Sequence, residues 1–219
     1  MKSIQMKKNI CRPLLILFTV FTTTYFFVES TDSFARIIGR CRPTRGQDTN
    51  RSERACSLRS QHLENTAKAF EKDVQQRPEL ANRPFMRVLF WPNLNMGFGH
   101  VALEVFRGKK TYDAEPELHV SYAMGNSLYQ DLYKHQQLPE VIELPPLSDQ
   151  NYNNFIKWFN NSPYSGQNRS ISYGSDYDPI HHNCANAVFN CLENSGYSLP
   201  RSPRIARPRL IRNIAWRLQ

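Results

Sequence analysis

Two stretches of the chain have the hydrophobic pattern of β-strands. Residues 85–91 are almost continuously apolar, as expected for a buried strand. Residues 100–106 alternate, with valine and leucine on one face and His100, Ala102 and Glu104 on the other. The pattern therefore predicts a sheet of several strands. Shorter β-rich segments are found at residues 111–114, 119–123 and 141–144.

Four segments are predicted as helices from apolar spacing and from residues typical of helix ends. Ser148 is suited to cap the start of one helix, and Gly196 to follow the end of another. Together with the sheet, these helices predict an α+β fold in which helices pack on an antiparallel sheet. The predicted helices span residues 60–76, 127–135, 148–161 and 184–194.

The first 35 residues have the form of a secretory signal peptide. Four basic residues precede an apolar run at residues 13–28, and the small residues Ser33 and Ala35 predict cleavage after Ala35. The alternative is an uncleaved membrane anchor. A helix of residues 13–28 would rise only ~24 Å, against a hydrocarbon core of ~30 Å. We therefore expect an exported protein, periplasmic or secreted, or one that residues 13–28 hold at a membrane.

The net charge of +9 is concentrated near the two ends of the chain. Residues 36–59 carry seven arginines and two acidic residues, and we expect them to form a flexible basic arm. Residues 201–219 carry six arginines and no acidic residue. Such ends suit an anionic membrane surface or lipopolysaccharide, whereas nucleic acid is the least expected partner of an exported protein.

The C-terminal segment, residues 201–219, also has apolar side chains interleaved with its arginines. This pattern is typical of an amphipathic helix that lies on a membrane surface. It equally fits a helix docked on the body of the protein, where residues 60–200 carry eleven basic and fifteen acidic residues. We favour the docked helix.

Length and composition exclude several other classes of protein. With 219 residues, 40% of them hydrophobic, the chain can bury the core of one domain, which we assign to residues 60–200. Nine glycines stand against fourteen prolines, and the sequence has neither a GxGxxG nor a P-loop motif. Both observations argue against a nucleotide-binding fold, and no cofactor is expected.

Because the protein is expected to be exported to an oxidising compartment, its cysteines can form disulfides. Cys41 and Cys56 could close a small loop in the arginine-rich segment. Cys184 and Cys191 lie two turns apart on one predicted helix, ~10.5 Å along its axis. A disulfide requires Cα atoms within ~7 Å, so these two cannot pair without unwinding the helix. At least one thiol near Cys184 is therefore expected to stay free.

His100 and Cys184 are the pair of residues most suited to chemistry. Cys184 begins a predicted helix, where the helix dipole and the unpaired backbone N–H groups favour a thiolate. His100 begins a predicted strand and could take the thiol proton and return it to a leaving group. The backbone N–H of Cys184, with a side-chain donor from Asn183 or His182, would suit an oxyanion. Taken singly, the cysteine could equally be a buried filler and the histidine a rim residue.

The sequence GHVALEV at residues 99–105 and the sequence NCANAV at residues 183–188 resemble the circularly permuted papain-like hydrolases. That class includes the lecithin:retinol acyltransferase-like, PPPDE-type and YiiX-type groups, in which the histidine strand precedes the cysteine helix. The resemblance covers residues 85–200 and also includes Leu192, Gly196 and Pro200.

The resemblance implies that Cys184 is the nucleophile and that His100 is the general base. The family's third polar residue sits on a strand after the histidine, and Asp113, His119 and Ser121 compete for that role here. Glu104 lies ~13 Å from His100 along the strand, too far to orient the imidazole. The doubled histidine at residues 181–182 departs from the family pattern.

The doubled histidine also raises the question of a metal. His181, His182, Cys184 and His100 could supply zinc ligands. However, no CxxC or HxxxH spacing supports such a site, and adjacent histidines rarely point at one ion. The sequence therefore predicts no metal.

The function expected from these observations is an exported thiol hydrolase or acyltransferase. It would cleave an amide or ester bond in a peptide, a peptidoglycan cross-bridge or a lipid acyl group through an acyl-enzyme on Cys184. The alternative is a module without catalytic activity that binds anionic surfaces through its arginine-rich ends. A secreted effector that acts on another cell is a third interpretation.

Overall fold

The central sheet is built on the two strands with the strongest sequence signal. In the computed structural model, β1 (Phe85–Trp91) and β2 (His100–Phe106) pair antiparallel, with Phe85 opposite Phe106 and Trp91 opposite His100. Every residue of both strands is buried. Both spans agree with the sequence prediction. The structure describes residues 41, 46–92, 99–109, 115–122, 127–165, 183–201 and 206–219.

Two shorter strands complete a four-stranded antiparallel sheet with the order β3-β2-β1-β4. β3 (Leu118–Val120) pairs with β2, and β4 (Glu140–Glu143) pairs with β1. They correspond to the strands predicted at residues 119–123 and 141–144, each displaced toward the N-terminus. The strand predicted at residues 111–114 lies outside the described residues. The α+β class with an antiparallel sheet is therefore confirmed.

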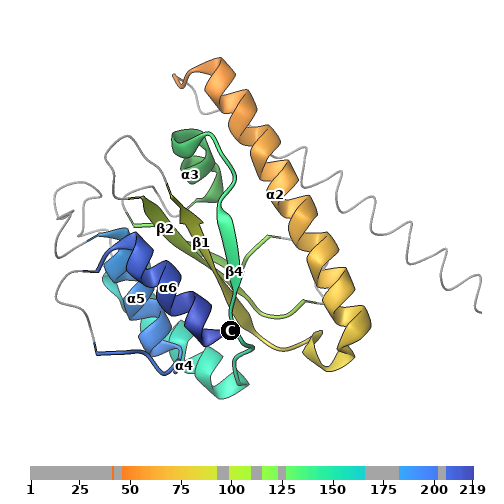
Figure 1. Ribbon diagram of the computed structural model, residues 1–219, viewed down its shortest axis with the longest axis vertical. Coiled ribbons are helices and arrows are strands. Elements are labelled where there is room, and N and C mark those ends of the chain that lie inside the picture. The colour runs from red at the N-terminus through yellow and green to blue at the C-terminus, as the bar shows by residue number, and fades with distance from the viewer. Residues whose placement is uncertain are drawn as a thin grey trace, which may run out of the picture. The chain divides into compact units, whose positions relative to one another are not determined.

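Helices α4 (Asp149–Asn160), α5 (Cys184–Asn194) and α6 (Pro208–Leu218) gather on one side of the sheet (Figure 1). They cover the face that carries Val101, Leu103 and Val105, and together they form the main hydrophobic core. Ser148 caps α4 as predicted, because its side chain accepts a hydrogen bond from the backbone N–H of Asn151. α5 has the predicted span.

Helix α2 (Thr49–Gln76) lies on the other side of the sheet, and α3 (Leu128–His135) packs against it (Figure 1). The sequence predicted a flexible arm over residues 36–59 and a helix that begins only at residue 60. That boundary is wrong, because the helix begins at Thr49 with Asp48 as its N-cap. The apolar pattern did not indicate these first turns because they are rich in arginine, and their buried residues, Ser52 and Ala55, are small.

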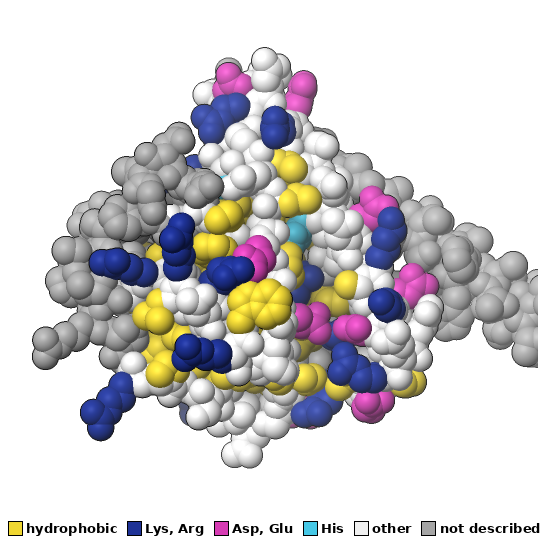
Figure 2. Space-filling model, viewed as in Figure 1, with side chains coloured by type: hydrophobic (Ala, Val, Ile, Leu, Met, Phe, Trp, Pro, Cys, Tyr) yellow, Lys and Arg dark blue, Asp and Glu magenta, His cyan; other side chains and the backbone are white. Residues whose placement is uncertain are grey.

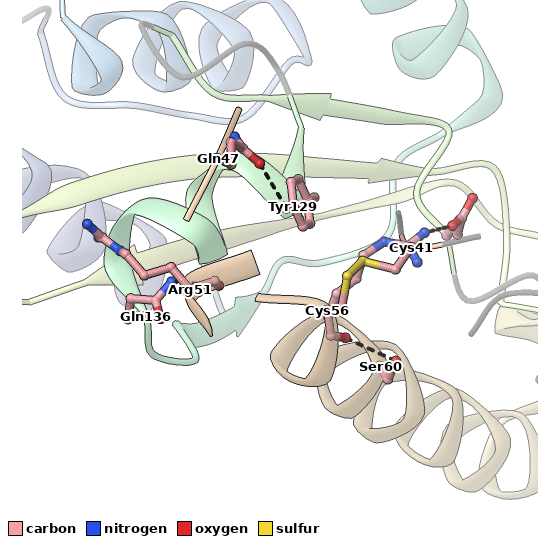
Figure 3. Close-up of a disulfide and its surroundings, with 9 residues drawn as sticks. Cys41, Gln47, Arg51, Cys56, Ser60, Tyr129 and Gln136 are labelled. Carbon is pink, nitrogen blue, oxygen red and sulfur yellow. Dashed lines mark hydrogen bonds and ion pairs between the residues drawn. A yellow bond between two sulfur atoms is a disulfide. The ribbon is translucent and has the colours of Figure 1, made fainter. Parts of the chain in front are cut away.

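The first turns of α2 are joined to the segment before them by a disulfide and to the end of α3 by hydrogen bonds (Figure 3). A disulfide joins Cys41 to Cys56, a pairing that the sequence had left open. The Arg51 guanidinium donates to the backbone oxygens of Tyr133 and Lys134, and the Gln136 side chain donates back to the Arg51 carbonyl. These contacts hold the C-terminal end of α3 against α2.

The C-terminal helix α6 is docked on the body, as the sequence analysis favoured. Its residues Ile211, Ile214 and Ala215 are buried in the main core, and Arg212 donates twice to the carboxylate of Glu140. On the face drawn in Figure 2, basic side chains lie among exposed hydrophobic ones over this helix. Among the described residues, no helix has the length and apolar content needed to cross a membrane, and residues 13–28 lie outside that part of the chain.

Candidate active site

Cys184 is the first residue of α5, and the local sequence explains why the helix begins there. The side-chain oxygen of Asn183 accepts hydrogen bonds from the backbone N–H groups of Ala185 and Asn186, at 2.8 and 3.0 Å. The amide of Asn183 also donates to the carbonyl of Ala206. An asparagine N-cap of this kind satisfies two of the unpaired helix donors. The backbone N–H of Cys184 is not among the groups that this cap engages.

His100 is placed by the sharp turn that precedes β2. Gly99 has a φ of +72°, in the left-handed region that glycine adopts without strain. A Cβ at this position would lie 2.8 Å from the carbonyl oxygen of Trp91, which is closer than real Cβ contacts. Only glycine therefore lets β2 begin at His100 directly opposite Trp91.

The structure brings the two predicted residues into contact. α5 packs against β2, and Cys184 lies close enough to the imidazole of His100 to raise its pKa. Both residues are nearly inaccessible, with 6% of Cys184 and 3% of His100 exposed. Burial alone would lower the pKa of His100, but the charge and hydrogen bond of Asp131, together with Cys184, raise that pKa to about 10. The imidazole is therefore positively charged at neutral pH.

Ser121 and Asp131 hold the far side of the His100 ring. The Nε2 atom of His100 lies 3.1 Å from the hydroxyl of Ser121 and 3.2 Å from a carboxylate oxygen of Asp131. The Ser121 hydroxyl donates to the same carboxylate oxygen at 2.7 Å, so its lone pair is directed at Nε2. Because the Ser121 hydroxyl can only accept a hydrogen bond from His100, the Nε2 atom of His100 must carry a proton. This leaves Nδ1 as the nitrogen that suits Cys184.

Asp131 was missed by the sequence analysis, although a signal was present. It is completely buried on the inner face of α3, where it shares a stripe at helical spacing with Leu128, Leu132 and His135. A carboxylate among apolar residues on one helix face requires a charged partner. Burial alone would raise the pKa of Asp131, but His100 and His119 hold it well below its usual range.

His119 contacts the site only indirectly. Its Nε2 atom lies 2.9 Å from the second carboxylate oxygen of Asp131, and its ring also faces Glu104. Burial alone would lower the pKa of His119, but the hydrogen bond to Asp131 and the nearby carboxylate of Glu104 raise it to about 9. His119 is therefore a partner of Asp131, while Ser121 touches His100 itself.

A row of charged residues continues this network across the sheet. Glu143, Arg87, Glu104 and His119 are direct cross-strand neighbours in register. The guanidinium of Arg87 lies 2.8 Å from the carboxylate of Glu104, and a ring nitrogen of His62 lies 3.3 Å from it. Burial alone would raise the pKa of Glu104, but the charges of His62 and Arg87 hold it well below its usual range.

Two aromatic rings enclose His100 on the remaining sides. The indole of Trp91 lies 5.4 Å from the His100 ring, and the imidazole of His135 lies 4.9 Å from it, measured between ring centres. His135 also packs on Trp91. Burial and the charge of His100 lower the pKa of His135 to about 4, so this second imidazole is neutral.

The remaining predicted site residues have different outcomes. Asp113 and His182 lie outside the described residues. The carboxamide of Asn183 serves as the helix cap and as a donor to Ala206, so it is bound to the backbone on both its oxygen and nitrogen sides. Cys184 and Cys191 are both free thiols, as expected from their separation. Burial strongly raises the pKa of Cys191, which makes it an unreactive thiol.

Comparisons with known protein families, with curated proteins and with solved structures found no match to this chain.

Proposed function

We propose that the protein is an exported thiol hydrolase or acyltransferase with a permuted papain-like fold. The observation that carries the proposal is the proximity of Cys184 to His100, with Asp131 and Ser121 at Nε2 of the same imidazole. A nucleophile, a base and a group that orients the base are the three parts that nucleophilic catalysis requires. They come here from α5, β2 and α3.

The reaction begins with the thiolate of Cys184 beside the imidazolium of His100. The sulfur attacks the carbonyl carbon of an amide or ester, and a tetrahedral intermediate forms. As the intermediate collapses, the C–N or C–O bond breaks, and His100 gives its proton to the departing amine or alcohol. The acyl group is then bound to Cys184 as a thioester.

The second half of the reaction releases the acyl group. His100, now neutral, removes a proton from a water molecule, whose oxygen attacks the thioester carbonyl. The product acid leaves, and the thiolate and imidazolium are restored. An amine or alcohol in place of water gives acyl transfer by the same steps.

The negative oxygen of both tetrahedral intermediates needs hydrogen-bond donors. The backbone N–H of Cys184, at the positive end of α5, is the donor that we propose. Because the Asn183 side chain is committed to its cap and to Ala206, a second donor is not assigned to it.

The substrate class follows from the chemistry and from the expected export. Amides and esters outside the cytoplasm include peptides, peptidoglycan cross-bridges and lipid acyl groups. The alternative, a module that binds anionic surfaces through arginine, is less favoured, because Arg51, Arg59 and Arg212 each have partners within the protein.

The experiment that tests the proposal is alkylation of the native protein with iodoacetamide, followed by peptide mass spectrometry. Cys184 is expected to react rapidly at mildly acidic pH, where ordinary thiols are protonated. Cys191 serves as an internal control and is expected to react only after unfolding. In the variant H100A, labelling of Cys184 is expected to fall to the rate of an ordinary thiol. Slow labelling of both cysteines in the native protein would overturn the proposal in favour of the binding module.

A further inference from the structure

His135 is a buried imidazole without a hydrogen-bond partner on either nitrogen among the described residues. Its exposed fraction is 8%, and it lies beside a charged histidine and a carboxylate. A buried polar atom left unpaired costs about 1–3 kcal/mol, so such an atom requires an explanation. Imidazole nitrogens are common metal ligands, so a buried imidazole that lacks a partner among the described residues points to a bound ion.

The donor atoms needed for a metal site are gathered around this residue. One nitrogen of His100, one nitrogen of His135 and one carboxylate oxygen of Asp131 all lie within 4.8 Å of one another, and all three residues are buried. They come from β2 and from two positions one turn apart on α3. Spacing along the chain gave no sign of this cluster, and it differs from the doubled-histidine site considered in the sequence analysis.

The relation between the two imidazoles is the one that a shared ion requires. With Zn–N bonds of about 2.0–2.1 Å, each ring centre lies about 3.2 Å from the metal, so tetrahedral ligands place two ring centres about 5 Å apart. The centres of His100 and His135 are 4.9 Å apart. A shared ion would draw the three donor atoms, which lie within 4.8 Å of one another, to about 3.3 Å apart.

Hydrogen bonds behind the ligands support the same interpretation. The second oxygen of Asp131 accepts from His119, and Trp91 packs on both imidazoles. Such outer contacts fix the orientation of metal ligands.

We propose that His100, Asp131 and His135 form a binding site for a divalent zinc-type cation, which inhibits the thiol chemistry of Cys184 reversibly. Two imidazoles and one carboxylate suit zinc and neighbouring transition metals, and are a poor match for magnesium or calcium. Three protein ligands leave a fourth position open. Metal binding does not depend on the proposed function. Inhibition does, because a metal that displaces the proton of His100 and occupies its nitrogen removes the base that Cys184 needs.

The test uses the full chain with its disulfide intact, freed of metal by a chelator and then titrated with ZnCl₂ by calorimetry. One zinc ion per chain is expected, with no binding of Mg²⁺. The variant H135F keeps the ring contact with Trp91 but has no donor, and it is expected to bind zinc at least about a hundredfold more weakly. The variant H62Q changes a buried histidine outside the cluster and is expected to bind zinc as the wild type does.

Alkylation of Cys184 gives the second readout. Zinc is expected to slow this labelling in the wild type, and to leave it unchanged in H135F. Failure of the wild type to bind zinc, or equal zinc affinity of wild type and H135F, would overturn the metal site. Slow labelling of Cys184 in metal-free wild type would instead overturn the proposed thiol chemistry, and zinc binding would then be judged by calorimetry alone.

Discussion

A carboxylate oxygen of Asp131 lies 3.2 Å from the Nε2 atom of His100, although the two residues belong to different elements, α3 and β2. Ser121 bridges the same pair through its hydroxyl. The carboxylate thus fixes the ring of His100 and stabilises its positive charge. Asp131, which the sequence analysis did not consider, is therefore expected to orient the base together with Ser121.

The first prediction concerns the charge of Asp131. In D131N the side chain keeps its size but loses its charge, so the imidazolium of His100 loses its stabilising partner. Labelling of Cys184 by iodoacetamide at neutral pH is expected to fall about tenfold or more. The variant S121A, which removes only the bridge, is expected to have a smaller effect.

The matched control for this prediction is D149N, the same substitution at an exposed residue in the first turn of α4. Its labelling rate is expected to equal that of the wild type. Circular dichroism of each variant separates a loss of reactivity from a loss of fold. Normal labelling of Cys184 in a folded D131N protein would contradict the role assigned to Asp131.

The second prediction concerns the turn before β2. In G99A the methyl group would meet the carbonyl oxygen of Trp91 at 2.8 Å, so the backbone must shift and His100 with it. Labelling of Cys184 is expected to decrease. The control is G46A, because Gly46 also has a positive φ, of +90°, but open space around it. Both variants are expected to lose roughly 1–2 kcal/mol to backbone strain, and only G99A to lose reactivity. Equal labelling of the two variants would contradict this assignment.

The third prediction concerns stability at acid pH. The folded-state pKa of Glu104 lies well below its usual value, whereas an unfolded glutamate titrates near about 4.3. The stability that Glu104 contributes is therefore fully present above about pH 5 and is lost as the pH falls through the folded-state pKa. The free energy of unfolding, measured with urea, is therefore expected to decrease from neutral pH to pH 3.

The variant E104Q removes the charge that compensates buried Arg87. It is expected to lower the free energy of unfolding at neutral pH by about 3–5 kcal/mol, and to weaken the dependence on acid pH. The control E64Q changes an exposed glutamate that pairs with Lys68, and should lie within about 0.5 kcal/mol of the wild type. An acid dependence identical in E104Q and wild type would rule out Glu104 as its source.

The fourth prediction concerns the docking of α6. Ile211 is completely buried, so I211A is expected to lower the free energy of unfolding by about 2–5 kcal/mol. Trp216 is 48% exposed, and W216A is expected to lower it by less than about 1 kcal/mol. Thermal or urea unfolding measures both. Unchanged stability of I211A would mean that α6 is not held on the core in solution, and would revive the membrane-surface interpretation.

Local pattern was sufficient for the central strands and for the helix of Cys184. β1, β2 and α5 have the predicted spans because continuous or alternating apolar residues, Asn183 at the cap and Gly196 after the end all favour the same structure. The start of α2 was misplaced, because its first turns have few large apolar residues and are held by the disulfide and by contacts with α3. A disulfide and hydrogen bonds to another helix do not produce a periodic pattern of apolar residues in the sequence.

The sequence by itself determined that a histidine would begin a strand and a cysteine would begin a helix, since both depend on residues within a few positions. Only the tertiary structure decided which polar side chains surround that histidine. Asp131, Ser121 and His135 reach it because α3 is pressed against α2 while β3 pairs with β2. Burial then strengthens the electrostatic interactions among these side chains, because water no longer screens their charges.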